Sequence, residues 1–469
     1  MQSSAFREYD IRGKVGTELT IEHMYEVTRS ILNYFLQKNS AIQKVIVGMD
    51  GRLSSTPIKE QVIAALTDCG IDVVFIGICP SPVLYFGLHT LPVDAGLMIT
   101  ASHNPKEYNG LKILLGTKTI WGKGIKDILS LYQEKKFAPL SKKKGNLKES
   151  SLNDSYIRWL KNHFNHLVGI SLPMVIDLGN GTGGTILPTL VNEMEWHNVI
   201  LHCATVDGNY PNHEADPTVE KNMHHVQKTL YEGKALVGFG LDGDCDRMAG
   251  MTQEGFLVPG DQLLAIFIQD LIKKYPHTKV VFDIKVSLGL IELLNEWNIE
   301  WIMAPCGHSI IKEQMDLHNA LIGGELSCHF FFSDRHFGFD DGIYALLRLI
   351  EILHKTGKSL GELIAIIPKK FSSPEIRLEC LEEKKEPIIN YLKDLFQNKA
   401  DVDLITIDGI RVNFINGWAN IRASNTQPVL SMRFEGNSLN DLTSISSIFI
   451  EALKPFFDEG KLKQRILNI

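Results

Sequence analysis

Features that would narrow the function at once are scarce in this 469-residue sequence. Its seven cysteines are odd in number, widely spread and never arranged as a C-x-x-C pair, which argues against a disulfide framework and favours a reducing compartment. Neither sign of charge is strongly in excess, since 48 Lys and Arg against 55 Asp and Glu give a net charge of −7. This balance excludes a nucleic-acid surface built on global basicity. Any anion site must therefore gather its Lys and Arg residues locally, on loops.

The sequence also lacks an uninterrupted apolar run. Residues 73–93 carry no Asp, Glu, Lys or Arg and are long enough for a bilayer, but Pro80 and Pro82 divide them into a strand, a turn and a short helix. The N-terminus reaches Arg7 before any apolar segment, so we expect no signal peptide. We expect a cytoplasmic monomer without membrane or nucleic-acid partners.

Two common catalytic motifs are absent from the sequence: it has no G-x-S-x-G elbow, and Gly357-Lys358-Ser359 lacks the upstream glycine of a Walker A loop. The segment GNGTGG (179–184) does fit G-x-G-x-x-G, follows an apolar run and has Asp207 after the next strand. This pattern keeps open an NAD-dependent oxidoreductase, although the helical pattern after the glycines is weak.

The sequence repeats one kind of unit. Apolar runs at 45–50, 174–179 and 280–285 each end in a carboxylate and a turn, and a helical pattern follows each. Such strand, helix, strand units predict parallel sheets with functional loops beyond the strand ends. We therefore expect three α/β domains, in line with roughly 150 residues per domain.

A fourth unit follows the turn-rich segment 368–374. Beyond it, strand-like runs between two helical patterns predict a smaller α+β domain. The expected domains are 1–150, 151–255, 256–368 and 369–469.

The first candidate site lies in the segment 96–113, where an apolar strand runs into Thr-Ala-Ser-His-Asn-Pro. Ser102 is expected on an exposed turn, with His103 beside it and Lys112 on the returning strand. A serine hydroxyl needs a base or an electrophile to react, so these neighbours predict a nucleophile or phosphate carrier at Ser102. The alternative is an ordinary turn, because Ser, Asn and Pro are common turn formers.

The second candidate follows an apolar strand as Asp242, Asp244 and Asp246. In an extended loop, alternate residues face one side, so the three carboxylates are expected to converge and to need a hard cation. An EF-hand is excluded because Arg247 and Gln253 stand where that loop needs Gly and Glu, which leaves Mg²⁺. The alternative is a solvated acidic turn, against which Arg247 adds a group for phosphate.

Two further loops carry binding groups. The segment 421–428 offers a guanidinium, hydroxyls and backbone N–H groups suited to phosphate; these come from Arg422, Ser424, Asn425 and Thr426. After two glycines, Glu325, Ser327 and His329 alternate, and we expect them to line one wall that binds sugar hydroxyls.

Taken together, six ordered motifs resemble the α-D-phosphohexomutase family, and within it the bacterial phosphomannomutase/phosphoglucomutase branch. They are FREYDIRG (6–13), TASHNP (100–105), DGDCDR (242–247), GHS (307–309), GELSCH (324–329) and RASNTQP (422–428). The resemblance covers nearly the whole chain. It implies the α/β fold class, with four domains around a central cleft, of which the first three share a mixed α/β core.

The resemblance also implies residue roles. Ser102 would be the phosphoserine, and the Mg²⁺ ligands would be Asp242, Asp244, Asp246 and an oxygen on Ser102. The groups around the transferring phosphoryl would be Tyr9, Arg12, His103, Lys112, Arg247 and Lys285. The sugar contacts would be His308, Glu325, Ser327 and His329, and the second phosphate would be held by Arg422, Ser424, Asn425 and Thr426.

The implied reaction interconverts hexose 1-phosphate and hexose 6-phosphate. Phosphoserine donates to the substrate, the hexose 1,6-bisphosphate turns over, and its other phosphate returns to Ser102, with the bisphosphate also serving as activator. Phosphoryl transfer is mostly positioning and charge neutralisation, which these residues supply. His329 or Lys112 would take the proton of the attacking hydroxyl.

Alternatives stay open at this point. Mannose and glucose phosphates are not distinguished, and a phosphoglucosamine mutase is disfavoured by the sequence RASNT. A sugar-phosphate binding protein without turnover is the third class, against which the intact Ser102 and Lys112 argue. Cys245 and Cys328 depart from the family pattern without replacing an expected ligand.

Overall fold

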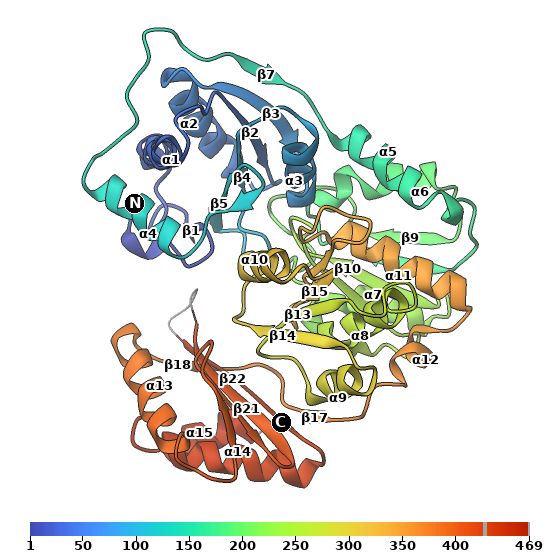
Figure 1. The fold of residues 1–469 in the computed structure, drawn as a ribbon. Coiled ribbons are helices and arrows are strands. Elements are labelled where there is room, and N and C mark those ends of the chain that lie inside the picture. The colour runs from blue at the N-terminus through green and yellow to red at the C-terminus, as the bar shows by residue number, and fades with distance from the viewer. Residues whose placement is uncertain (425–428, 468–469) are drawn as a thin grey trace. The chain divides into compact units, whose positions relative to one another are not determined.

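The structure is a computed structural model that describes residues 1–424 and 429–467. The chain divides into two compact units, one made of Met1–Leu263 with Ser327–Leu363 and the other of Leu264–Leu326 with Ile364–Ile469. The strands and helices follow one another along the chain as coloured in Figure 1. Three mixed α/β domains and a C-terminal domain with an antiparallel sheet confirm the predicted fold class.

The first sheet has the order β1-β5-β4-β2-β3-β7, with β6 paired to β5. Its strands are β1 (Ile11–Lys14), β2 (Lys44–Met49), β3 (Asp72–Ile78), β4 (Ala95–Ile99), β5 (Tyr108–Leu115), β6 (Lys118–Thr119) and β7 (Leu147–Glu149). Its helices are α1 (Met24–Lys38), α2 (Ser55–Asp68), α3 (Ser81–Thr90) and α4 (Lys123–Gln133). The central strands β2, β3 and β4 are parallel and covered on both faces, which is why they read as continuous apolar runs.

The second sheet has the order β12-β11-β10-β8-β9. Its strands are β8 (Met174–Asp177), β9 (Val199–His202), β10 (Val237–Leu241), β11 (Met248–Met251) and β12 (Leu257–Val258). The same compact unit contains α5 (Asn153–His163), α6 (Leu187–Glu193), α7 (His224–Tyr231), the start of α8 (Gly260–Leu271), β16 (Phe330–Phe332), α11 (Gly342–Thr356) and α12 (Leu360–Ile364). Helix α11 begins where the Asp341 carboxylate accepts from the Tyr344 N–H, and it ends at Gly357, whose φ of 65° suits glycine.

In the other unit, β13 lies between the parallel strands β14 and β15. The strands and helices of this α/β portion are β13 (Lys279–Asp283), α9 (Leu288–Glu296), β14 (Glu300–Ala304), α10 (His308–His318) and β15 (Ile322–Gly324). The C-terminal sheet is antiparallel, in the order β17-β22-β21-β20-β19 with β18 paired to β22. It contains β17 (Phe371–Ser372), β18 (Ile376–Glu379), α13 (Glu382–Phe396), β19 (Asp403–Ile405), β20 (Ile410–Phe414), β21 (Gly417–Ala423), β22 (Val429–Gly436), α14 (Leu439–Leu453) and α15 (Glu459–Ile466).

The apolar run at 73–93 folds as the sequence predicts, into β3, a turn at the prolines and α3. Within the part of the chain that the structure describes, no helix is long and apolar enough to cross a membrane.

Candidate active site

Ser102 lies in the loop between β4 and β5, and it is buried, with 3% of its surface exposed. The expectation of an exposed turn was therefore wrong. The residue adopts a φ of 50°, and its N–H donates to the Thr100 hydroxyl at 2.9 Å. Its hydroxyl donates to Oδ2 of Asp242 at 2.6 Å, so the side chain turns inward to the carboxylates.

The Ser102 loop is held by a residue to which the sequence assigned no role. Arg52 pairs with Asp50, and its guanidinium donates to the carbonyls of Ser102 and Asn104 at 2.8 and 2.6 Å and also to two carbonyls further along the loop. The turn DGR was visible in the sequence as a basic turn, but its partners about 50 residues away were not. Five donors in a rigid fork make Arg52 the clamp of this loop.

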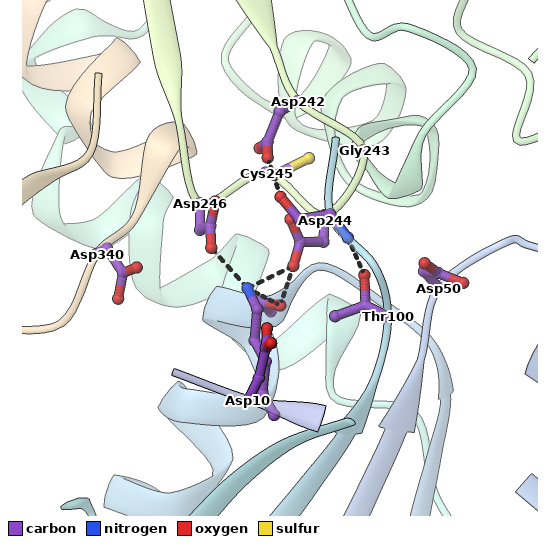
Figure 2. A network of polar contacts seen from close by, with 12 residues as sticks. Asp10, Asp50, Thr100, Asp242, Gly243, Asp244, Cys245, Asp246 and Asp340 are labelled. Atoms are coloured by element: carbon purple, nitrogen blue, oxygen red, sulfur yellow. Dashed lines mark hydrogen bonds and ion pairs between the residues drawn. The ribbon is translucent and has the colours of Figure 1, made fainter. Parts of the chain in front are cut away.

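The three aspartates follow β10 and converge, but not by the extended alternation that we expected. Asp242 to Asp246 form a turn, in which the Cys245 N–H donates to the Asp242 carbonyl at 3.1 Å and Cys245 has a φ of 59°. One oxygen from each of Asp242, Asp244 and Asp246 lies within 4.8 Å of the others. Figure 2 shows the three side chains gathered at this turn. A turn, and not the alternation of side chains along an extended loop, therefore brings the three carboxylates together.

These carboxylates require positive charge. Burial, together with Asp246 and Asp244, raises the pKa of Asp242 well above its usual range, which marks a site where negative charge is unfavourable. Lys112 meets part of this need: its Nζ donates to Oδ2 of both Asp244 and Asp246 at 2.6 Å. Ser81, on α3, is a further neighbour, and its hydroxyl donates to Asp244 Oδ2 at 2.6 Å.

The donor set fits Mg²⁺. Oδ1 of Asp244 is buried, and no group among residues 1–424 and 429–467 gives it a hydrogen bond. Three carboxylates and a hydroxyl oxygen are hard ligands of the kind that Mg²⁺ prefers. The residues present can therefore hold this ion.

His329 and Arg247 form a second part of the site. The two residues share an isolated β-bridge, and Arg247 Nε donates to Nε2 of His329 at 2.9 Å. Nδ1 of the imidazole faces Oδ2 of the buried Asp340 at 3.2 Å. Because arginine can only donate, the neutral ring accepts at Nε2 and carries its hydrogen on Nδ1, towards the carboxylate.

Two more predicted residues, His103 and Arg12, lie close to the Ser102 loop. His103 Nδ1 is 3.2 Å from the Ser102 hydroxyl, and burial, with the charge of Arg247, lowers the pKa of His103 well below its ordinary value, so that the ring is neutral. Arg12 pairs with Asp10 and donates to the Asn104 side chain at 2.8 Å. Tyr9 is half-buried.

The other compact unit gathers a separate set of predicted residues. Arg422 Nε donates to Oδ2 of Asp408 at 2.8 Å, and the same oxygen accepts from the Cys306 N–H at 3.1 Å. Glu325 accepts from the Gly307 N–H at 2.6 Å, directly before His308, the buried first residue of α10. Asp408 thus ties the His308 loop to Arg422, a role that no motif indicated.

Lys285 follows β13, and the carbonyls of its loop accept from two arginines that we had not singled out. Arg433 donates to the Lys285 carbonyl at 2.7 Å, and Arg411 donates to the two flanking carbonyls at 2.6 and 2.8 Å. Burial lowers the pKa of the Lys285 ammonium, but neighbouring groups, Cys306 and Asp283 foremost, outweigh burial and raise it. The ammonium is therefore charged, and it lies 3.6 Å from Oδ2 of Asp283.

The structure describes the predicted sugar-binding loop in full and the predicted phosphate loop in part. Glu325, Ser327 and His329 do not alternate along a strand, because β15 ends at Gly324 and a turn follows in which Cys328 has a φ of 68°. Ser327 itself is half-buried. In the predicted phosphate loop, Lys385 Nζ donates to the Ser424 carbonyl at 2.8 Å. Asn425 and Thr426 lie outside the described residues.

The GNGTGG segment packs against the aspartate turn. A Cβ on Gly181 would stand 2.7 Å from the Gly243 carbonyl oxygen, and one on Gly243 would stand 2.5 Å from the Ser102 carbonyl oxygen. The Thr182 N–H donates to the Gly243 carbonyl at 2.9 Å. These glycines permit a close approach of backbones, and the helix after them, α6, has only seven residues, so the segment does not have the form of a dinucleotide-binding loop.

Comparison with protein families matches the chain in four successive parts. The matches are described as "Phosphoglucomutase/phosphomannomutase", with alpha/beta/alpha domain I over residues 3–138, domain II over 154–255, domain III over 259–371 and the C-terminal domain over 375–452.

Individual relatives agree with these matches. A phosphomannomutase/phosphoglucomutase of Pseudomonas putida is 38% identical, over 96% of this chain and 95% of its own. A phosphoglucomutase of Neisseria meningitidis is 37% identical over 95% of each chain. The crystal structure of a phosphoglucomutase/phosphomannomutase family protein from Burkholderia thailandensis superposes with a TM-score of 0.88 at 31% identity, covering 97% of this chain and 98% of that one.

Two more distant structures share the fold and contain ligands. Both are of N-acetylphosphoglucosamine mutase from Aspergillus fumigatus: one, 14% identical with a TM-score of 0.62 over 96% of this chain and 95% of that one, is a complex with glucose 1,6-bisphosphate. The other, 15% identical with a TM-score of 0.56 over 80% of this chain and 92% of that one, is a complex with GlcNAc-6P and magnesium.

Proposed function

The chain belongs to the phosphoglucomutase/phosphomannomutase family of phosphohexomutases, which are isomerases of carbohydrate metabolism, and on that premise we propose that Ser102 carries the phosphoryl group in transfer. The observation that supports this proposal is the 2.6 Å contact between the Ser102 hydroxyl and Asp242, in a loop whose neighbouring carboxylates need a cation. We infer that the reaction interconverts hexose 1-phosphate and hexose 6-phosphate through a hexose 1,6-bisphosphate, which also serves as activator.

In this proposal Asp242, Asp244, Asp246 and an oxygen on Ser102 hold Mg²⁺, which when bound neutralises charge on the transferring phosphoryl group. Lys112 and Arg247 add fixed positive charge on the protein side, beside the aspartate turn. Arg12 and His103 complete the surroundings of Ser102, and Tyr9 belongs to the same group.

The proton of the attacking sugar hydroxyl is assigned to His329. As the bond from phosphorus to the Ser102 oxygen breaks and the bond to the sugar oxygen forms, that hydroxyl proton needs an acceptor with a lone pair. Nε2 of His329 has one once Arg247, whose Nε donates to it at 2.9 Å here, turns to the phosphoryl group, and Asp340 on the other side of the ring stabilises the imidazolium that results. Lys112 is the weaker candidate because its ammonium already donates to Asp244 and Asp246.

The substrate-binding roles follow the motifs of the family resemblance. We propose that His308, Glu325, Ser327 and His329 contact the sugar, that Lys285 contacts the substrate, and that the phosphate that is not transferred is bound by Arg422, Ser424, Asn425 and Thr426. The relatives are named for both mannose and glucose phosphates, so we propose that this chain accepts both. We further propose that the enzyme is a cytoplasmic monomer.

Ser102→Ala tests the phosphoserine. We expect intact-mass analysis to find one phosphoryl group on purified wild-type protein and none on the variant, with kcat lowered by more than about a thousandfold because the carrier is gone. Turnover is measured with mannose 1-phosphate and glucose 1-phosphate, in Mg²⁺ and the matching bisphosphate.

Ser130→Ala, at an exposed position on α4, is the matched control and should keep both phosphorylation and turnover. Phosphate on wild-type protein without turnover of any hexose phosphate would indicate a binding protein. Turnover by Ser102→Ala at the wild-type rate would refute the carrier role.

A further inference from the structure

A cluster of three potential ligands lies at the ends of β8 and β9 and shares no residue with the aspartate turn. Asp177 ends β8, Cys203 directly follows β9, and His213 lies in the loop beyond it. Asp177 Oδ2 is 3.1 Å from His213 Nε2 and 3.8 Å from Cys203 Sγ, and the last two atoms are 3.7 Å apart. These atoms form one compact group of donors.

We propose that Asp177, Cys203 and His213 form a binding site for a borderline transition-metal ion, with Zn²⁺ as the best fit. Donors bound to one tetrahedral zinc at 2.0 to 2.3 Å stand about 3.3 to 3.6 Å from each other, close to the three separations observed here. Three protein ligands leave the fourth position to water. Thiolate and imidazole select zinc over Mg²⁺, so the site differs in kind from the aspartate turn.

The groups around the cluster orient the three ligands. Asp177 accepts the Gly179 N–H on Oδ1 at 2.7 Å, which leaves Oδ2 facing the cluster. His213 Nδ1 lies 2.8 Å from the Glu214 carbonyl, which requires a hydrogen on that nitrogen and directs Nε2 at Asp177. Second-sphere contacts of this kind are typical of histidine and carboxylate metal ligands.

The cluster already needs a cation. A lone pair on His213 Nε2 would face the Asp177 carboxylate at 3.1 Å, so either a proton or a metal ion must lie between them. A metal ion in the same place would satisfy all three groups, whereas a proton joins two.

Alkylation of the cysteines provides a direct test. Among the seven cysteines, Cys203 and Cys69 are half-buried and the other five are buried. We expect one equivalent of Zn²⁺, added to the full chain in excess Mg²⁺, to protect Cys203 from N-ethylmaleimide as read by peptide mass mapping, while Cys69 reacts as before. Equal protection of both cysteines, or of neither, overturns the proposal and leaves only an ion pair at Asp177.

Affinity for Zn²⁺, measured against a chromophoric chelator, provides the second readout. Cys203→Ser and His213→Gln should each bind Zn²⁺ at least about tenfold more weakly than wild type, because even the loss of an outer-sphere partner costs that much. His202→Gln is the matched control, since Nε2 of that neighbouring histidine pairs with Thr229 instead, and it should bind as wild type does.

If His213→Gln does not fold, Cys203→Ser decides the question, since it changes one atom of a half-buried side chain. Wild-type affinity in Cys203→Ser would refute the site. Because neither readout depends on turnover, the outcome is independent of the function proposed above.

Discussion

At the scale of single residues, Glu375 shows how charge can override burial. Burial raises the pKa of its carboxyl, but the Lys285 ammonium and a hydrogen bond from the Ser431 hydroxyl at 2.7 Å outweigh this and lower it to about 2. A lowered pKa stabilises the fold above the unfolded value of about 4.5, and the contribution is lost as the pH falls from there through about 2. Glu375→Gln should therefore lower the thermal midpoint at pH 7, by an amount that shrinks between pH 4.5 and 3.

Glu383→Gln, at an exposed position on α13, provides the comparison and should show no such pH-dependent difference. Calorimetry across this pH range measures both variants. A deficit in Glu375→Gln that stays constant down to pH 3 would show that packing, and not charge, is what the carboxylate contributes.

Single residues were predicted from the sequence where their neighbours are local. The spacing of Asp242, Asp244 and Asp246 was enough to predict their grouping, although a turn and not a pleat brings them together. Asp340 and Asp408 were missed because the chain bends between each of them and its partner, His329 or Arg422, and no helix or strand periodicity predicts such contacts.

At the scale of elements, the β4–β5 loop depends on one side chain. Arg52 is fully buried against Asp50 and donates to four carbonyls of the loop. Arg52→Lys keeps the charge but loses the planar fork, so we expect kcat to fall at least about tenfold and the unfolding free energy to fall by about 2 to 4 kcal/mol.

Arg29→Lys is a suitable control, because Arg29 also donates to a loop carbonyl, that of Ala138, and we assign it no role in the site. It should leave kcat unchanged. Steady-state kinetics and chemical denaturation measure both variants, and an Arg52→Lys enzyme with normal kcat would show that the loop keeps its shape without the clamp.

The strands were easier to predict than the loops that follow them. The apolar runs that became β2, β8 and β13 were recognised because parallel strands are buried on both faces. The loops were not, since their shapes depend on left-handed residues such as Ser102, Cys245 and Cys328, where no glycine marks the position. The burial of Ser102 follows from such a conformation and could not be read from a turn-forming sequence.

At the scale of the whole molecule, the predicted roles divide between the two compact units. Ser102 and the three aspartates belong to one unit, and Lys285, His308 and Arg422 belong to the other. We therefore expect Arg422→Ala to raise KM by roughly ten- to a hundredfold, with kcat changed much less, since a charged hydrogen bond to substrate is lost in ground and transition state alike.

Arg465→Ala, at an exposed position on α15 of the same unit, is the control and should change neither parameter. Initial rates over a range of hexose phosphate concentrations separate the two effects. A fall in kcat at constant KM would move Arg422 from substrate binding to the chemical step.

The number and order of the domains were predicted because each expected domain has a recognisable pattern of strands and helices. Three strand, helix, strand units and one α+β unit correspond in order to the four family matches. The division into two compact units was not predicted, because one unit takes Ser327–Leu363 out of the expected domain 256–368, and no sequence pattern marks that change.

The packing of Gly181 on Gly243, and of Gly243 on the Ser102 loop, has a consequence for how such a site changes over generations. Beside the reactive serine, three separate loops meet backbone to backbone. A side chain added at either glycine would push these loops apart, so the loops tolerate no larger residue there. We therefore expect substrate specificity to vary through the sugar-binding and phosphate-binding loops, while the loops that carry out phosphoryl transfer stay the same.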